Sequence, residues 1–235
     1  MDDDGKMEFL KYEGEPIYYD IDYSNVLYEN QSGKFVDVSQ KARVKNPGLG
    51  MDGVAADFDN DGDIDLYIIN GGDRYENMPN VLYLNNGDGT FSDIAAHVGV
   101  EGTNEGRADA VAALDHDNDG DLDLFVVNGG GPAPLNKGPH EFWRNDTEAG
   151  NWLKVKLIGT KSNLWSMGSE VTVSIDDKQT VQALTATTAR FATSVAPLHF
   201  GLGAAKKATV KVLWPSGRTL EIQTEANRTL ELIEP

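Results

Sequence analysis

The amino-acid sequence predicts an all-β protein in which incomplete propeller-like blades precede a C-terminal antiparallel β-sandwich. Short apolar segments alternate with polar residues at a period of two along most of the chain, which is typical of β-strands. Turns rich in glycine, asparagine and aspartate separate these segments. A block of sequence recurs after 58 residues, which indicates repeated structural units. The 235 residues, 40% of them hydrophobic, suffice to bury the cores of such units.

The composition excludes several classes of protein. The net charge of −18 argues against nucleic acid as a partner, because phosphate backbones are bound by clusters of lysine and arginine. No apolar run approaches the roughly 20 residues that a membrane-spanning helix needs, so membrane insertion is not expected. The absence of cysteine excludes disulfide scaffolds, thiol catalysis and thiolate metal sites.

Residues 1–25 are predicted to form an N-terminal arm. Its first ten residues, MDDDGKMEFL, have neither a basic region nor an apolar core, so they are not expected to act as a signal peptide. Ile17, Tyr19 and Ile21 share one face of an extended strand. This strand either pairs with another chain or is an ordinary first strand of the fold.

Two acidic segments stand out in the repeated region. Each places five carboxylates within nine residues, with a glycine at the sixth position both times. Carboxylates at this density repel one another strongly unless a cation neutralises them. The acidic residues are Asp57, Asp59, Asp61, Asp63 and Asp65 in the first segment, and Asp115, Asp117, Asp119, Asp121 and Asp123 in the second.

The pattern D-x-D-x-D-G-D-x-D matches the first nine positions of a calcium loop. Side chains at positions 1, 3 and 5 can converge on one ion, and position 7 can offer its carbonyl. Position 12 is Ile68 or Val126, which cannot ligate, so the acid at position 9 is expected to complete the shell. We therefore predict two calcium ions. Magnesium fits less well because it retains waters, and a merely solvated loop would need no fixed spacing.

Each repeat is predicted to contain four strands, with the acidic loop between the first two. The second and third are joined by a loop, and the last two by a glycine-rich turn. In the first repeat this turn is Asn86-Gly87-Asp88-Gly89, where Asp88 is assigned to turn formation rather than to a third metal site. Residues 26–38 resemble the end of the first repeat. Because a closed propeller needs about four to eight blades, the repeats of this chain cannot close a ring alone. Either the chain is a fragment of a longer propeller, or its edges are covered by the arm, the sandwich or another copy.

Residues 26–150 resemble the FG-GAP (VCBS-type) repeats of extracellular β-propellers such as those of integrin α chains. The resemblance rests on the acidic loop, the following strand and the N-N-G-D-G-T-F turn, which occur in the order of that family. It implies that each loop binds calcium and stiffens its blade. It also implies that Asp63 and Asp121 contribute backbone carbonyls.

Residues 151–235 are predicted to form the sandwich, with about six short alternating strands. Three segments resemble the ASPIC/UnbV domain, which follows FG-GAP repeats in secreted proteins. They are NWLKVKLIGTKSN (151–163), LHFGLG (198–203) and VLWPSG (212–217). Leu164 departs from the arginine usual in the family, and Met167-Gly168-Ser169-Glu170 replaces the usual Ile-Gly-Ala-Arg.

The sequence contains no arrangement typical of an enzyme. It lacks the HExxH, GxSxG and phosphate-loop patterns, and Ser216 lies in a predicted turn. His116 occupies a non-ligand position of the second loop and is expected to point away from the metal. His199 is expected to be a packed histidine.

Two functions therefore remain open from the sequence. One is a calcium-rigidified extracellular structural protein that self-associates, as a homo-oligomer or a fibre, through open β-edges. The other is a monomeric calcium-dependent adhesion module that binds an extracellular protein or glycan.

Overall fold

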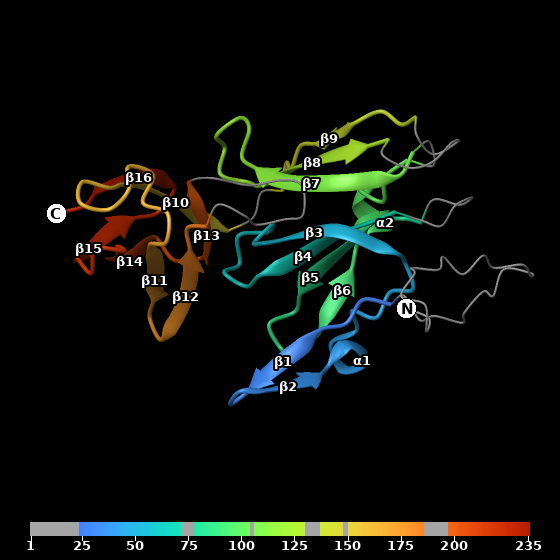
Figure 1. Cartoon of the computed structure of the whole chain (residues 1–235), viewed down its shortest axis with the longest axis horizontal. Helices are drawn as coiled ribbons and strands as arrows, with labels where there is room; N and C mark the ends of the chain where they lie inside the picture. Colours follow the sequence, from blue (N-terminus) through green and yellow to red (C-terminus); the bar gives the residue numbers. More distant parts are fainter. Residues whose placement is uncertain (1–23, 72–77, 104–105, 130–136, 148–149, 186–196) are drawn as a thin grey trace, which may run out of the picture.

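The computed structural model describes residues 24–71, 78–103, 106–129, 137–147, 150–185 and 197–235. The fold is nearly all β, which confirms the predicted class (Figure 1). The predicted arm falls almost wholly outside the described residues. No helix in these ranges is long and apolar enough to cross a membrane.

The first blade is a four-stranded antiparallel meander in the order β3-β4-β5-β6. The strand predicted after the first acidic loop is β4, in which Tyr67 and Ile69 are fully buried and the alternating Leu66 and Ile68 are half-buried. A short helix follows the last strand. The elements are β3 (Gly50–Ala56), β4 (Asp65–Asn70), β5 (Val81–Asn85), β6 (Phe91–Asp93) and α2 (Ala95–Val98).

The second blade has three strands, β7 (Ala108–Leu114), β8 (Asp123–Asn128) and β9 (Glu141–Trp143), in the order β7-β8-β9. The fourth strand expected from the repeat is absent among the described residues. The reason lies in the chain path, because only seven residues separate Trp143 from the first strand of the sandwich at Asn151. The segment that forms β6 and α2 in the first blade here leads into the next domain.

The two blades share one apolar core. β3 and β7 lie side by side, and the Tyr67 hydroxyl donates a hydrogen bond of 2.7 Å to the Val100 carbonyl. Tyr67 and Trp143 meet edge to face, with ring centroids 6.2 Å apart. The core is formed by Phe58, Tyr67, Ile69, Leu82, Ala95, Val100, Ala108, Val111, Ala113, Leu122, Leu124 and Val126.

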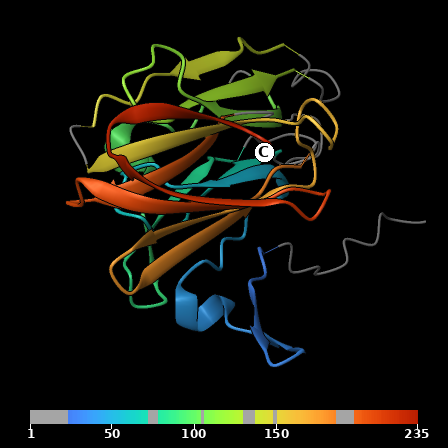
Figure 2. The same ribbon diagram turned by 90° about the vertical axis from the view of Figure 1, so that its left-hand side faces the viewer.

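An N-terminal hairpin unit precedes the first blade. It consists of β1 (Tyr28–Gln31), β2 (Lys34–Asp37) and α1 (Ser39–Ala42), and it lies at the lower end of the molecule in both views (Figures 1 and 2). Its hydrogen bond from the Val38 amide to the Leu27 carbonyl matches that from Ile94 to Leu82 in the first blade, both 2.9 Å. The predicted resemblance of residues 26–38 to the end of the first repeat is therefore confirmed.

The C-terminal region is a sandwich of two sheets. Strands β10 (Asn151–Ile158), β13 (Leu198–Gly203) and β16 (Arg228–Ile233) form one sheet in the order β13-β10-β16. Strands β11 (Glu170–Ile175), β12 (Lys178–Ala183), β14 (Lys207–Leu213) and β15 (Thr219–Glu225) form the other, in the order β12-β11-β14-β15. Both sheets contribute buried residues to one core, which includes Leu153, Val210 and Trp214.

One strand pair departs from the expected antiparallel arrangement. β10 and β16 pair in parallel, with Val155 opposite Leu230. Parallel pairing requires a long crossover connection, and here the intervening five strands supply it. The other pairs of the sandwich are antiparallel.

Glu234, directly after β16, ties the end of the chain to the β10–β11 connection. Its buried carboxylate accepts hydrogen bonds of 2.7 Å from the backbone amides of Thr160, Lys161 and Ser162, and another from the Ser216 hydroxyl. Burial alone would raise the pKa of Glu234, but these hydrogen bonds outweigh it and hold the pKa well below its usual range.

We expect Glu234→Gln to destabilise the sandwich at neutral pH, because an amide NH₂ would face amide donors that the carboxylate accepts. A carboxylate with a lowered pKa stabilises the fold above its ordinary pKa, and this contribution is lost as the pH falls below that value. The difference between wild type and variant should therefore shrink in acid, as measured by urea unfolding at pH 7 and pH 3. Glu231→Gln, which alters an exposed ion pair with Lys156, should have little effect. An equal effect of both variants would contradict this role of Glu234.

Candidate metal centre

Both acidic loops lie at the ends of the blades that face the sandwich (Figure 1). The first loop connects β3 to β4 and the second connects β7 to β8. Positive φ angles at Asn60 and Gly62, and at Asn118 and Gly120, curl each backbone around its acidic side chains. Asparagine and glycine tolerate this left-handed conformation best, which explains why they occupy positions 4 and 6 of each loop.

In the first loop, the carboxylates of Asp57, Asp59 and Asp61 converge. One oxygen atom from each lies within 4.8 Å of the others. The Asp57 carboxylate also accepts hydrogen bonds from the amides of Asp61, at 3.1 Å, and Gly62, at 2.8 Å. These bonds hold the loop in the shape that brings positions 1, 3 and 5 together.

In the second loop, Asp115, Asp117 and Asp119 form the same arrangement, again within 4.8 Å. Asp115 Oδ2 accepts a hydrogen bond of 2.8 Å from the Gly120 amide and pairs with the ammonium of Lys154. Asp115 Oδ1 is buried and has no hydrogen-bond partner. A buried carboxylate oxygen without a partner is costly. The donor set is oxygen only, so the loop fits a hard cation such as calcium.

Positions 7 of the two loops have partners outside their own loops. The carboxylate of Asp63 forms an ion pair of 2.8 Å with Lys178 of the sandwich. The carboxylate of Asp121 accepts a hydrogen bond of 2.7 Å from the side-chain Nδ2 of Asn60 in the other loop. These side chains are engaged elsewhere, which leaves the backbone carbonyls as the groups that could face an ion.

Positions 9 close the loops by hydrogen bonding. Asp65 accepts from the amides of Phe58 and Asn85, both at 2.8 Å. Asp123 accepts from the amides of His116 and Asn145, both at 2.9 Å. Asp65 lies outside the group formed by Asp57, Asp59 and Asp61, whereas Asp123 groups with Asp117 and His116. These hydrogen bonds fix the first loop to β5 and the second loop to the residue pair that follows β9.

His116 differs from the expectation that it points away from the metal loop. Its ring groups with Asp117 and Asp123, and Nδ1 lies 3.9 Å from an oxygen of Asp123. The ring also meets Phe142 edge to face, with centroids 4.9 Å apart. His116 therefore lies over the rim of the second loop.

Burial dominates the electrostatics of the loops. It raises the pKa of Asp57 to about 7 and that of Asp65 to about 6, and neighbouring carboxylates add to the effect. Burial, followed by the charges of Asp119 and Asp115, raises the pKa of Asp121 to about 6. Crowded carboxylates with raised pKa values favour any cation that neutralises them.

Asn60 connects the two loops with the sandwich and is completely buried. Its Nδ2 donates to the Asp121 carboxylate at 2.7 Å and to the Gly120 carbonyl at 3.2 Å. Its Oδ1 therefore accepts the 2.7 Å hydrogen bond from His199, which assigns the ring proton to Nε2. Burial, and secondly the Lys154 ammonium, lower the pKa of His199 to about 4, so that the ring is neutral at pH 7. The expectation of a packed histidine is confirmed.

Glycines allow the close approach of the sandwich to the loops. A Cβ on Gly201 of β13 would overlap the Asp57 carboxylate, and a Cβ on Gly120 would overlap the Trp152 ring of β10. The Gly203 amide donates a hydrogen bond of 2.8 Å to the Asn60 carbonyl. Sequence reasoning missed this interface, because the residues of β10 and β13 carry no local signal that they contact an acidic loop.

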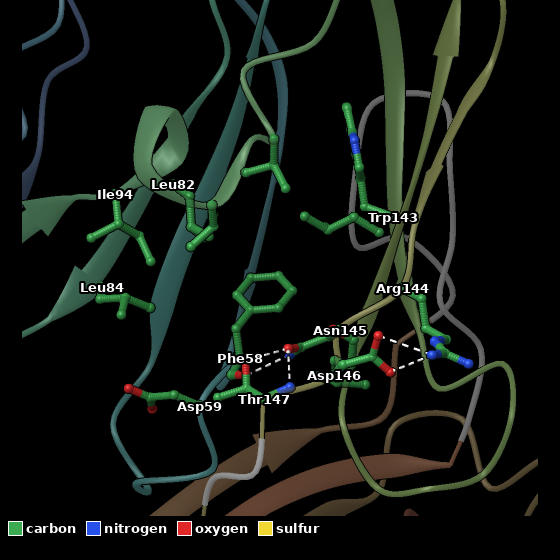
Figure 3. A pocket seen from close by; sticks show the side chains of 14 residues that line it. Phe58, Asp59, Leu82, Leu84, Ile94, Trp143, Arg144, Asn145, Asp146 and Thr147 are labelled. Atoms are coloured by element: carbon green, nitrogen blue, oxygen red, sulfur yellow. Dashed lines mark hydrogen bonds and ion pairs between the residues drawn. The ribbon is translucent and has the colours of Figure 1, made fainter.

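A second feature of the repeat region is a cleft of about 450 Å³ between the outer parts of the two blades. Figure 3 shows Leu82, Leu84 and Ile94 of the first blade on one side and Trp143 of the second on the other. Arg144 and Asp146, paired at 2.7 Å, lie at its polar side. The cleft is mostly apolar.

His140 and Asp88 form hydrogen bonds that stabilise the backbone of the blades. His140 Nδ1 accepts a hydrogen bond of 3.2 Å from the Asn128 amide, as Asn80 does from Asn70 in the first blade. Asp88 accepts from the Thr90 amide at 2.9 Å, in agreement with its assignment to the turn.

Comparison with known proteins agrees with this architecture. A family model described as FG-GAP-like repeat matches residues 1–68 and 57–126, and one described as ASPIC and UnbV matches residues 159–235. Both resemblances noted in the sequence are thereby confirmed. The first match includes residues 1–25, which we assigned to a separate arm.

Curated relatives carry both regions within longer chains. Cartilage acidic protein 1 of Mus musculus and of Homo sapiens are each 27% identical over 190 residues, which cover 77% of this chain and 28% of the relative. The Xenopus tropicalis protein of the same name is 27% identical over 230 residues, which cover 89% of this chain and 33% of the relative. This chain thus matches no more than 33% of the length of these relatives.

Proposed function

We propose a function from the family, because this chain belongs to the FG-GAP-like repeat family and carries an ASPIC and UnbV domain. The protein is a non-enzymatic extracellular structural protein that is stabilised by calcium. Two ions are expected, one in each acidic loop. The extracellular assignment is supported by the similarity to Cartilage acidic protein 1, whose name places those relatives in cartilage.

The observation that carries the calcium proposal is the same threefold carboxylate arrangement in both loops. Asp57, Asp59 and Asp61 would hold one ion, and Asp115, Asp117 and Asp119 the other. The backbone carbonyls of Asp63 and Asp121 would complete each shell, as the family resemblance implies, and calcium accepts six to eight such oxygens.

Bound calcium would supply positive charge at the centre of each loop. The charge would neutralise carboxylates that are otherwise crowded and partly buried, and would fix the connection between the inner strands of each blade. Lys154 occupies one oxygen of Asp115 and leaves Oδ1 available. The second site therefore requires no displacement of the sandwich.

Calorimetric titration with calcium tests this assignment. The wild type is expected to bind two ions, and Asp61→Ala and Asp119→Ala are each expected to lose one and retain the other. Asp88→Asn is the matched control, because this exposed turn carboxylate lies outside both loops. Unchanged stoichiometry in the loop variants, or no binding by the wild type, would refute the proposal.

Self-association through exposed strand edges is the second part of the structural proposal. β9 is the outer strand of a blade that lacks its fourth strand among the described residues, and β1 and β2 form an isolated hairpin. Unpaired edges are sites where further strands or chains can add.

The alternative function is a monomeric calcium-dependent adhesion or ligand-binding module, whose ligand would be an extracellular protein or glycan. The cleft between the blades favours this alternative, because ligand sites are commonly concave and largely apolar with a few polar groups. Light scattering with and without calcium separates the two functions. A monomer at all concentrations favours the binding module, and concentration-dependent assembly favours the structural protein.

A further inference from the structure

The internal repeat allows the same positions to be compared in a blade that is covered and in a blade that is not. The two blades can be aligned because each contains the same hydrogen bond. The backbone amide of Asn85 donates to the Asp65 carboxylate in the first blade, and that of Asn145 donates to the Asp123 carboxylate in the second. In this alignment Phe125 corresponds to Tyr67, and Phe142 to Leu82.

The burial of these equivalent residues differs sharply. Tyr67 is 0% and Leu82 7% exposed, because the second blade packs on this face of the first. Phe125 is 38% and Phe142 43% exposed. The second blade therefore presents, without a cover in the described part of the chain, the face through which the first blade contacts its neighbour.

We call this surface the trailing face and define it by Ala112, Phe125 and Phe142. The strand register places these three residues opposite one another across β7, β8 and β9. His116 and His140 flank it through edge-to-face contacts with the two phenylalanines. It is a continuous apolar strip rather than a scatter of single exposed side chains.

The opposite end of the repeat region has a matching exposed surface. We call this surface the leading face and define it by Val26, Tyr28 and Phe35 of the hairpin unit. Tyr28 and Asn30 are two residues apart and so share one face of β1, and Phe35 lies directly opposite Asn30 on that face. Val26 precedes Tyr28 by two residues. Tyr28 is 57% and Phe35 67% exposed.

The equivalents of these residues in the first blade are covered. Val81, Tyr83 and Phe91 have the same register, and Tyr83 is only 3% exposed. They pack against Ala42 and Val44 of the preceding unit. In the first blade, the surface equivalent to the leading face is therefore covered by the preceding unit. The surface equivalent to the trailing face is covered by the unit that follows.

We infer that the trailing face of one copy of this chain packs on the leading face of a second copy. This inference rests on the proposed structural function and assigns its self-association to side-chain faces in place of strand edges. Within the chain, equivalent faces meet where the hairpin unit joins the first blade and where the two blades join. The two faces left uncovered by the described residues are the remaining halves of such a junction. The copies are therefore related as successive units of one repeat.

This contact is head to tail, because the two faces consist of different residues. A heterologous contact of this kind continues from copy to copy and produces a closed ring or an open fibre, depending on the rotation between copies. The contact uses side-chain faces and does not require strand donation by residues 1–25.

The test uses the full chain with calcium and measures mass by light scattering and sedimentation over a range of concentrations. The wild type is expected to assemble with increasing concentration. Phe142→Glu or Phe125→Glu, on the trailing face, and Phe35→Glu, on the leading face, should each be monomeric. Val181→Glu, an equally exposed position on the sandwich, is the matched control and should assemble like the wild type.

Mixing the variants distinguishes head-to-tail packing from other contacts. Phe142→Glu keeps its leading face and Phe35→Glu keeps its trailing face, so an equimolar mixture should form a 1:1 dimer and stop there. Association of Phe35→Glu with itself would show a symmetric contact between trailing faces and overturn the inference. Wild-type-like assembly by Phe142→Glu would overturn it as well.

Calcium titration of the same samples separates this inference from the proposed function. Each variant should still bind two ions, which also verifies that it is folded. A wild type that binds two ions but stays monomeric would overturn the inference and favour the binding module. A wild type that binds none would refute the calcium proposal independently of its mass.

Discussion

Removal of calcium is expected to lower the melting temperature of the repeat region and to reverse the pH dependence of its stability. At calcium concentrations a hundredfold above the dissociation constant, each ion contributes about 2.7 kcal/mol to the free energy of unfolding. Chelation removes both contributions and leaves the carboxylates of each loop without a counter-ion. The effect at pH 7.5 should therefore exceed that of any single surface substitution.

The sign of the pH dependence follows from the shifted pKa values. In the calcium-free protein, the raised pKa values of Asp57, about 7, and of Asp65 and Asp121, about 6, mean that the folded state binds more protons than the unfolded state between pH 4 and 7. Stability from these groups therefore increases as the pH falls from 7.5 to 5.

His199 acts in the opposite direction. Its pKa of about 4 in the folded state lies below the ordinary value of 6.5, so the unfolded state binds the extra proton between these values. Acidification from pH 6.5 towards 4 therefore costs stability at this residue. Three carboxylates act against one histidine, and the net gain of the calcium-free protein on acidification to pH 5 should persist.

The stability of the calcium-bound protein should instead decrease as the pH falls, since protons compete with the ions for the same oxygens. Calorimetric melts at pH 7.5, 6.5 and 5.5, with calcium and after its removal by dialysis, measure both slopes. Asp57→Asn should flatten the slope of the calcium-free protein, because it removes the carboxylate with the highest of these pKa values. Parallel slopes in the two conditions would contradict this account.

Gly120→Ala is expected to disrupt the contact between the second loop and the sandwich. The substitution places a Cβ in a left-handed backbone conformation, which costs about 1–2 kcal/mol. It also forces that Cβ into the Trp152 ring, and such overpacking costs about 1–3 kcal/mol. We expect a total loss of about 2–5 kcal/mol, measured by urea unfolding.

Gly89→Ala provides the matched control. Gly89 has a similar positive φ of 81°, but no atom lies near its added Cβ, so only the conformational cost remains. Unfolding of Gly120→Ala should also separate into two transitions, because the sandwich has its own core and loses its contact with the blades. Equal destabilisation by both variants would show that the loop does not hold the domains together.

Features that depend on nearby residues could be predicted from the amino-acid sequence. The period of two predicted a strand directly after each acidic loop, because side chains of a strand point to opposite faces. The D-x-D-x-D-G spacing placed positions 1, 3 and 5 of each loop together, because asparagine and glycine at positions 4 and 6 turn the backbone. The assignment of Asp88 to a turn follows from the same local chemistry.

Which surfaces meet depends on contacts between distant parts of the chain and could not be predicted. The hydrogen bond of Asn60 to His199 spans 139 residues, and the pairing of Asp115 with Lys154 joins two domains. The parallel pairing of β10 with β16 depends on the whole path of the sandwich. Leu82 and Phe142 are both apolar and occupy equivalent positions of the two repeats, yet Leu82 is buried and Phe142 is exposed. Such differences have no local signature, because they depend on which unit the rest of the chain places against each face.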